Sequence, residues 1–249
     1  MYTPMVMQNL LFINTFFEEE LSLEKKEHSL LDWLQKHPLY LQLHYLSLLT
    51  ASHNETPLLA FRPEDRHLKT LETLGFSSNF CLISDSPTSS LLTSFGPSAS
   101  LQNWAKTKKA FYSIPDIDIV KKVQSKSFAL SLFPSLEGSS LIFDESSLLS
   151  FWNRVKGPKV LKTLHGSSGR GHFISTQDAE KSPEEALYFF QKQKAVSPEL
   201  VGQPWVERIL DFSSQWEILP NKSINHLGST LCQNSQKGTY QKSIVGPVD

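Results

Sequence analysis

The chain has 249 residues, 39% of them hydrophobic, and its 24 basic side chains nearly balance 25 acidic ones. This length allows one large domain or two smaller ones, and the hydrophobic content excludes a largely disordered chain. The balanced charge argues against a nucleic-acid-binding protein, which would carry a basic surface.

The N-terminus and the cysteines indicate a cytoplasmic protein. The first residues lack the basic start and long apolar run of a signal peptide, and no apolar segment is long enough to span a bilayer. Cys81 and Cys232 lie far apart and form no Cys-x-x-Cys motif, so two reduced thiols are a simpler interpretation than a disulfide, which stays possible. The spacing of Cys and His gives no metal site.

The first part of the chain alternates strand-like and helix-like segments. A helical pattern covers residues 31–49, with Pro38 as an interruption, and a second helix is expected at residues 63–74, ending at Gly75. Short apolar runs predict buried strands at residues 10–14, 57–61 and 80–84. This alternation predicts a parallel α/β layer.

The composition changes after residue 84. Residues 85–100 are rich in Ser, Thr, Pro and Gly, which predicts a long loop. A helix is expected at residues 101–111, and a longer one from Pro115 to about Leu132.

The second half favours antiparallel strands. Residues 159–164 and 171–175 predict two strands of a hairpin that is joined by a glycine-rich turn. Helices are expected after Asp144 or Ser146 and after Ser182. Further strands are predicted at residues 140–143, 200–207, 212–219 and 225–233. The fold class is therefore α/β at first and α+β in the second half.

The turn of this hairpin is a candidate phosphate-binding loop. It reads Gly166, Ser167, Ser168, Gly169, Arg170 and Gly171. Glycines let backbone N–H groups approach an anion, serine hydroxyls add donors, and Arg170 adds charge. Lys162, on the strand before the loop, can project toward the same phosphates. Taken alone, the loop fits an ordinary hairpin tip equally well. It is neither a P-loop nor a dinucleotide-binding loop, because a strand follows it instead of a helix.

The order of these features resembles the ATP-grasp superfamily. In that family one phosphate-binding lysine precedes the strand–loop–strand unit and a second lies on its first strand; here Lys126 and Lys162 hold these positions. The segment from Gln203 to Glu207 is similar to the family's hinge. The resemblance implies that backbone groups around Trp205 and Val206 bind adenine, and that Asp211, or alternatively Glu207, binds the ribose. Gly238, Thr239, Tyr240 and Gly246 resemble the loop region that follows the hinge.

The resemblance implies a division of the chain and a chemistry. Residues 1–112 would form the small α/β domain that precedes an ATP-grasp domain, and residues 113–249 an incomplete ATP-grasp nucleotide-binding domain with an antiparallel sheet. The implied ligand is ATP, with magnesium for the complete family fold. The implied reaction is that of a ligase, which activates a carboxylate as an acyl phosphate for attack by an amine or a similar nucleophile. The substrates are unknown, and a homodimer is possible.

The sequence departs from the family at its end. The acidic residue and the Glu-x-Asn pair that hold magnesium in the family have no counterpart before Asp249. We therefore expect a fragment or truncated form of a longer ligase, with incomplete catalytic competence. The alternative is a non-catalytic nucleotide-binding or interaction protein with a degenerate fold. No catalytic residue and no metal ligand is assigned.

Overall fold

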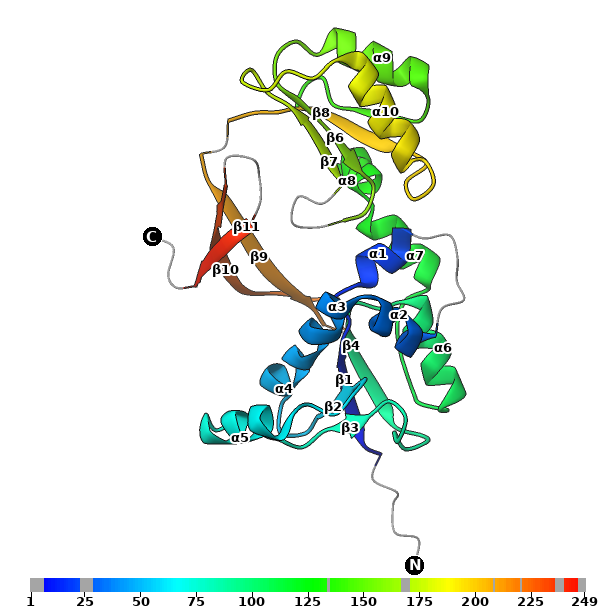
Figure 1. Ribbon diagram of the computed structural model, residues 1–249, viewed down its shortest axis with the longest axis vertical. Helices are drawn as coiled ribbons and strands as arrows, with labels where there is room; N and C mark the ends of the chain where they lie inside the picture. The colour runs from blue at the N-terminus through cyan, green and yellow to red at the C-terminus, as the bar shows by residue number, and fades with distance from the viewer. Residues whose placement is uncertain are drawn as a thin grey trace, which may run out of the picture. The chain divides into compact units, whose positions relative to one another are not determined.

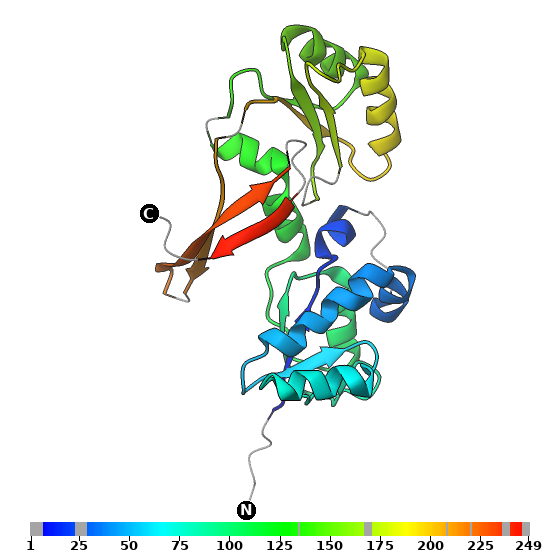
Figure 2. The same ribbon diagram turned by 60° about the vertical axis from the view of Figure 1, so that its left-hand side comes forward.

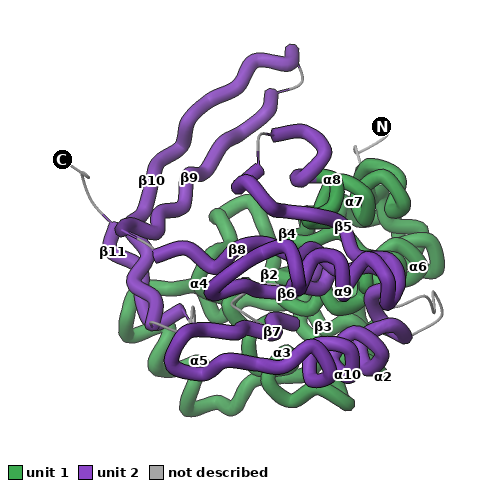
Figure 3. The backbone as a smooth tube through the Cα atoms, turned by 90° about the horizontal axis from the view of Figure 1, so that it is seen from above, with its two compact units in different colours: residues 1–128 green, residues 129–249 purple. Residues whose placement is uncertain are grey.

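A computed structural model of the chain describes residues 7–22, 29–133, 135–166, 171–207, 209–219, 221–235 and 240–245. The chain forms two compact units, residues 1–128 and 129–249 (Figure 3). The division falls inside helix α8 (Lys126–Leu132). The boundary at residues 112/113, expected from the family's domains, stays a prediction.

A parallel sheet forms the centre of the first unit (Figure 1). Its strand order is β3-β2-β1-β4, and β1 pairs in parallel with both β2 and β4. The strands are β1 (Asn9–Ile13), β2 (Thr56–Leu59), β3 (Cys81–Leu82) and β4 (Leu91–Phe95). The predicted α/β class is confirmed, and the three apolar runs do become strands, although β3 is short.

Strand β4 corrects the prediction of a loop throughout residues 85–100. It is an edge strand, and each residue of β1 pairs with one of its residues. Leu92 is buried whereas Thr93 is exposed, which is the alternation of a strand with one covered face. The small polar residues around this pair hid the alternation. The backbone groups along the free edge of β1 nevertheless require a partner strand.

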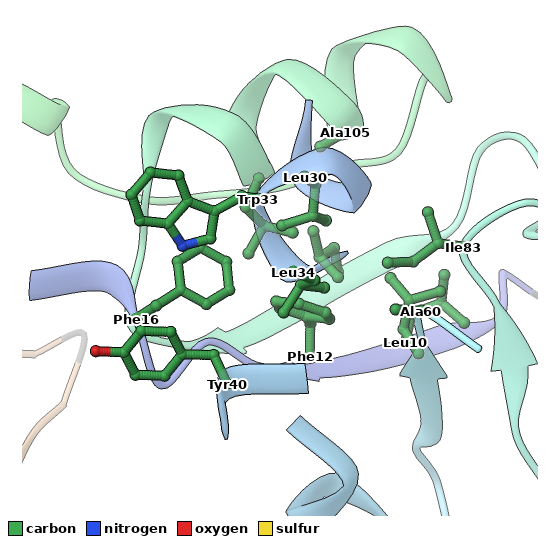
Figure 4. Packing of buried hydrophobic residues seen from close by; sticks show 13 residues of the cluster. Leu10, Phe12, Phe16, Leu30, Trp33, Leu34, Tyr40, Ala60, Ile83 and Ala105 are labelled. Atoms are coloured by element: carbon green, nitrogen blue, oxygen red, sulfur yellow. The ribbon is translucent and has the colours of Figure 1, made fainter. Parts of the chain in front are cut away.

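Helices and one 3-10 turn accompany this sheet, and Pro38 begins α3 as expected from its place between two helical runs. Their bounds are α1 (Phe17–Ser22), α2 (Leu30–Lys36), α3 (Pro38–Leu43), η1 (His44–Leu46), α4 (Ser47–Thr50), α5 (Asp65–Thr73), α6 (Ala99–Thr107) and α7 (Ile117–Gln124). The core holds Phe12, Leu34 and the rings of Phe16, Trp33 and Tyr40 (Figure 4).

A buried carboxylate connects two of these helices. Glu20 of α1 is only 8% exposed, and its side chain accepts hydrogen bonds from the Ser100 backbone N–H (2.6 Å) and hydroxyl (2.9 Å). Ser100 lies in the first turn of α6, where backbone N–H groups have no partner within the helix. Glu20 therefore completes the N-terminus of α6 from outside the helix.

The single helix predicted from Pro115 to Leu132 is two helices, α7 and α8. Ser125 between them is extended, with φ −75° and ψ 141°. Its hydroxyl donates to the Lys122 carbonyl (2.9 Å) and accepts the Phe128 N–H (3.2 Å). The prediction was wrong here because the serine hydroxyl offers the backbone an alternative to continued helix.

The second unit contains an antiparallel sheet of order β5-β8-β6-β7. Helices α9 and α10 cover one face of it (Figures 1 and 2), and Phe151, Leu161 and Phe190 pack between them. A capping box at Ser182 begins α10 as predicted, and of the two candidate caps Asp144 and Ser146 it is Asp144 that begins α9, also with a capping box. The bounds are β5 (Ser140–Ile142), α9 (Glu145–Arg154), β6 (Lys159–Thr163), β7 (His172–Ser175), α10 (Pro183–Gln193) and β8 (Leu200–Pro204).

A second antiparallel sheet has the order β11-β10-β9, with β9 (Asp211–Ile218), β10 (Ile224–Asn234) and β11 (Tyr240–Val245). Strands β9 and β10 agree with the predicted ones. Strand β11 corrects the expectation of a loop region at Tyr240, because residues 240–245 pair along β10. Gly238, Thr239 and Gly246 lie outside the described residues. The α+β prediction for the second half is confirmed.

Candidate functional site

Strand β6 presents its side chains alternately to the two faces of its sheet. Leu161 packs in the core beneath α9 and α10, so Lys162 projects from the opposite face, which we call the second face. The register pairs Val160 with Gln203 and Lys162 with Val201, which puts Gln203 on the second face beside Lys162. The Lys162 Nζ donates a hydrogen bond of 2.7 Å to the Gln203 Oε1.

The surroundings of Lys162 suit a group that receives an anion. Burial lowers the pKa of the Lys162 ammonium below its usual range. The hydrogen-bond partner that holds Lys162 is the neutral amide of Gln203, whose Nε2 in turn lies 3.4 Å from the Ser139 hydroxyl. A neutral partner orients the ammonium without cancelling its charge, and partial desolvation strengthens its attraction to a phosphate.

The glycine-rich loop begins where β6 ends. Gly166 and Gly171 both have positive φ, 119° and 70°, a region that favours glycine. The Thr163 N–H donates to the Gly171 carbonyl (2.9 Å), which closes the hairpin. A Cβ on Gly171 would lie 2.2 Å from the Thr163 Oγ1, so no larger residue fits there. Four residues predicted to bind phosphate lie outside the described residues: Ser167, Ser168, Gly169 and Arg170.

The predicted hinge lines a cavity of about 700 Å³ at the other end of β6. Trp205, Val206, Glu207 and Asp211 all contribute to its wall. The Trp205 N–H donates to the Pro158 carbonyl (2.9 Å), which fixes the hinge against the start of β6. The structure therefore brings the four predicted hinge and ribose residues to one cavity.

The two candidate acidic residues differ in their environment. Asp211 begins β9, and its Oδ2 accepts a hydrogen bond from the Asn234 Nδ2 (2.8 Å). Glu207 is an exposed residue of the segment between β8 and β9. The held position of Asp211 suits recognition of a ligand hydroxyl better than the exposed position of Glu207, and both roles stay predictions.

Lys126 is the remaining predicted phosphate-binding residue. It is the first residue of α8 and belongs to the first compact unit, whereas the other predicted site residues belong to the second. Its phosphate-binding role stays a prediction.

Several residues at the cavity were missed by the sequence reasoning. Thr176, Gln177 and Asp178 follow β7, and Gln233 and Asn234 end β10. The hairpin could have identified the first group, because an antiparallel strand that follows β6 returns to the start of β6, beside the hinge. No pattern in the sequence indicated the second group, whose place depends on the register of β9 and β10.

The described residues do not form a metal site or a membrane span. Among them, no group of three or more His, Cys, Asp or Glu could hold a metal ion. Likewise, no helix within the described ranges is both long and apolar enough to cross a membrane.

The fold is similar to that of solved N5-carboxyaminoimidazole ribonucleotide synthetases. The enzyme from Staphylococcus aureus matches with a TM-score of 0.52 and 13% identity, over 97% of this chain and 58% of that one. The ADP complex of the same synthetase matches with a TM-score of 0.50 and 13% identity, over 96% of this chain and 58% of that one. The ADP complex of the synthetase purK matches with a TM-score of 0.50 and 13% identity, over 95% of this chain and 56% of that one. This chain thus spans little more than half the length of these structures.

These likenesses concern the fold alone, because the identity is low. The matched enzymes are ATP-grasp enzymes, so the ATP-grasp-like fold predicted from the order of lysines, loop and hinge is confirmed. No protein-family model and no curated protein matches the sequence.

Proposed function

We propose that this chain, which has the fold of the ATP-grasp ligases, binds ATP along β6, with the phosphates at the glycine-rich loop and the base at the hinge. The observation that supports this most is the position of Lys162. Its charged group is partly buried, has a neutral partner, and lies between the loop at one end of β6 and the hinge cavity at the other.

The proposal gives each element one part of the nucleotide. Lys162 and the loop of Gly166, Ser167, Ser168, Gly169, Arg170 and Gly171 would bind phosphates, together with Lys126. Trp205 and Val206 would contact the base through their backbone and side chains. Asp211, or Glu207 in its place, would accept hydrogen bonds from the ribose hydroxyls.

Magnesium accompanies ATP in the complete family fold, but the described carboxylates do not fit a magnesium site. Asp178, Glu207 and Asp211 line one cavity, yet they do not form a group able to hold a metal ion. We therefore assign no metal ligand in this chain and no reaction step that depends on one.

The activity proposed for the whole protein is that of a cytoplasmic ligase that joins a carboxylate to an amine or similar nucleophile through an acyl phosphate. Its substrates are not identified. The alternative is a nucleotide-binding or interaction protein without catalysis. ATP turnover with magnesium, measured as released phosphate in the presence of candidate carboxylates, would favour the ligase. Nucleotide binding without turnover would favour the alternative.

Binding of ATP with magnesium should raise the melting temperature of the chain, and Lys162→Ala should remove about half of this shift or more. A ligand at one hundred times its Kd stabilises the folded state by about 2.7 kcal/mol, and removal of a partly buried ammonium should weaken binding by about tenfold or more. Differential scanning fluorimetry and calorimetric titration measure both effects.

The matched control is Lys156→Ala, which removes an exposed lysine from the same unit and should keep the full shift. A folded wild-type chain that shows no shift at millimolar ATP would refute both nucleotide-binding functions. An unchanged affinity of Lys162→Ala would refute the role of this lysine only.

A further inference from the structure

Strand β6 lies between β7 and β8 in its sheet and ends at Thr163, just before the glycine-rich loop (Figure 1). Thr163 shares the core face of β6 with Leu161, because side chains alternate along a strand. The residue is only 7% exposed, and it lies on the side of the sheet opposite to the second face, which carries Lys162. The Thr163 hydroxyl is therefore not placed to contact a nucleotide bound on the second face.

Thr163 nevertheless holds both described ends of the glycine-rich loop. Its hydroxyl donates a hydrogen bond of 2.7 Å to the carbonyl of His165, which directly precedes Gly166. Its N–H donates to the carbonyl of Gly171, at the other end of the loop, over 2.9 Å. The side chain also packs closely on Gly171, since an added Cβ there would lie 3.1 Å from the Thr163 Cγ2. One residue thus fixes where the loop leaves β6 and where it returns toward β7.

Ser197 supports this arrangement from the connection between α10 and β8. Its hydroxyl accepts the N–H of Leu164 (3.0 Å) and donates to the carbonyl of Glu199 (2.6 Å). Leu164 and Ser197 are both buried, and a buried N–H without a partner is costly, so this bond keeps the chain on its path as it leaves the sheet. The start of the loop is thereby held on both sides of β6, toward β7 by Thr163 and toward β8 by Ser197.

We propose that Thr163, with the support of Ser197, is a positioning residue for the phosphates of the nucleotide. The role rests on the proposed function, in which Lys162 and the glycine-rich loop bind these phosphates. A loop whose ends are fixed beforehand loses less conformational freedom when it binds, so its ligand binds more tightly. This gain extends only to ligands that contact the loop. It applies to ATP but not to adenosine, which has the base and the ribose without a phosphate.

Calorimetric titration with ATP and ligand-detected NMR titration with adenosine test this selectivity. Thr163→Val removes the hydroxyl and keeps a branched side chain. It should weaken ATP binding by about tenfold, which is the size of one hydrogen bond, while the affinity for adenosine changes by less than about twofold. Thr163→Ser keeps the hydroxyl and should bind ATP within about threefold of wild type. Ser197→Ala, which removes the partner of the Leu164 N–H, should show the same selective loss as Thr163→Val.

The matched control is Thr73→Val in α5 of the first unit. The Thr73 hydroxyl also donates to a backbone carbonyl, that of Lys69 (2.8 Å), but it is exposed. Its loss should leave the affinities for ATP and adenosine unchanged. Circular dichroism identifies any variant that fails to fold, and if Thr163→Val is such a variant, the comparison of Ser197→Ala with wild type decides.

Three results with folded chains would overturn this role of Thr163. They are an unchanged ATP affinity in the variant without the hydroxyl, an equal loss of affinity for ATP and adenosine, and an ATP affinity of Thr163→Ser as weak as that of Thr163→Val. If wild type binds ATP, each of these results refutes the positioning role alone. A wild-type chain that does not bind ATP would refute the proposed function together with it.

Discussion

Replacement of Phe151 by alanine should lower the free energy of unfolding of the second unit by about 3–5 kcal/mol. Phe151 of α9 is 1% exposed and packs against α10 and the sheet of strands β5, β8, β6 and β7. The substitution removes an aromatic ring from a closely packed core, and the surrounding backbone can close the resulting cavity only in part. Urea denaturation followed by circular dichroism measures the loss. Tyr188→Ala, at a residue of α10 that is 69% exposed, should change the stability much less.

Gly202 lies against the Phe151 ring, so a second substitution tests the same packing. A Cβ on Gly202 would lie 2.9 Å from two atoms of the Phe151 ring and 2.8 Å from the Ile142 Cδ1. Gly202→Ala alone should therefore cost about 1–3 kcal/mol through overpacking. In a variant that carries both Phe151→Ala and Gly202→Ala, the ring is absent and the new methyl group occupies part of the cavity. The two costs should then sum to more than the cost of the double variant; additivity within about 0.5 kcal/mol would contradict the packing described for this pair.

A fall in pH from 6.5 to 4 should destabilise the first unit by about 3 kcal/mol through His44 alone. The His44 residue is fully buried, its Nε2 accepts the N–H of Ala60 (3.0 Å), and its Nδ1 hydrogen-bonds to the Leu41 carbonyl. An acceptor at Nε2 and a donor at Nδ1 define the neutral ring. Burial lowers the pKa of His44 to about 4, and the bond to Leu41 opposes this shift.

The direction of this pH effect follows from the number of protons that the folded and unfolded states bind. In the unfolded chain the imidazole takes up a proton near pH 6.5, whereas in the folded chain it stays neutral down to about pH 4. The unfolded state therefore binds more protons between these values, and the stability that is complete above pH 6.5 is lost as the pH falls through this window.

Urea titrations at several pH values measure this loss. His44→Gln, which keeps an acceptor for the Ala60 N–H but does not titrate, should flatten the slope, while His53→Gln at an exposed position should retain it. An identical slope in wild type and His44→Gln would show that other groups control the acid stability.

Elements with strong local signals were predictable from sequence. The apolar runs at residues 10–14 and 57–61 became buried strands, and Ser182 with Glu185 formed the capping box that begins α10. The hairpin that presents Lys162 followed from the strand–glycine–strand pattern. In each case the residues themselves determine the local conformation, so no distant contact had to be known.

The errors share a physical cause. The strand at Leu91–Phe95 exists because the edge of β1 needs a partner, and β11 exists because β10 needs one. The break at Ser125 depends on one hydroxyl that caps both helices. At the candidate site, the contact of Gln203 with Lys162 required the register of β6 and β8, which no single segment encodes.

The contact between Glu20 and Ser100 has a consequence for the choice of ligands. The N-terminus of a helix attracts anions, because its N–H groups and its dipole favour negative charge. In α6 the carboxylate of Glu20 already occupies that position. A phosphate could bind there only by displacing a covalently attached competitor, whose effective concentration never falls. The first unit thus carries a built-in inhibitor of anion binding at this helix end.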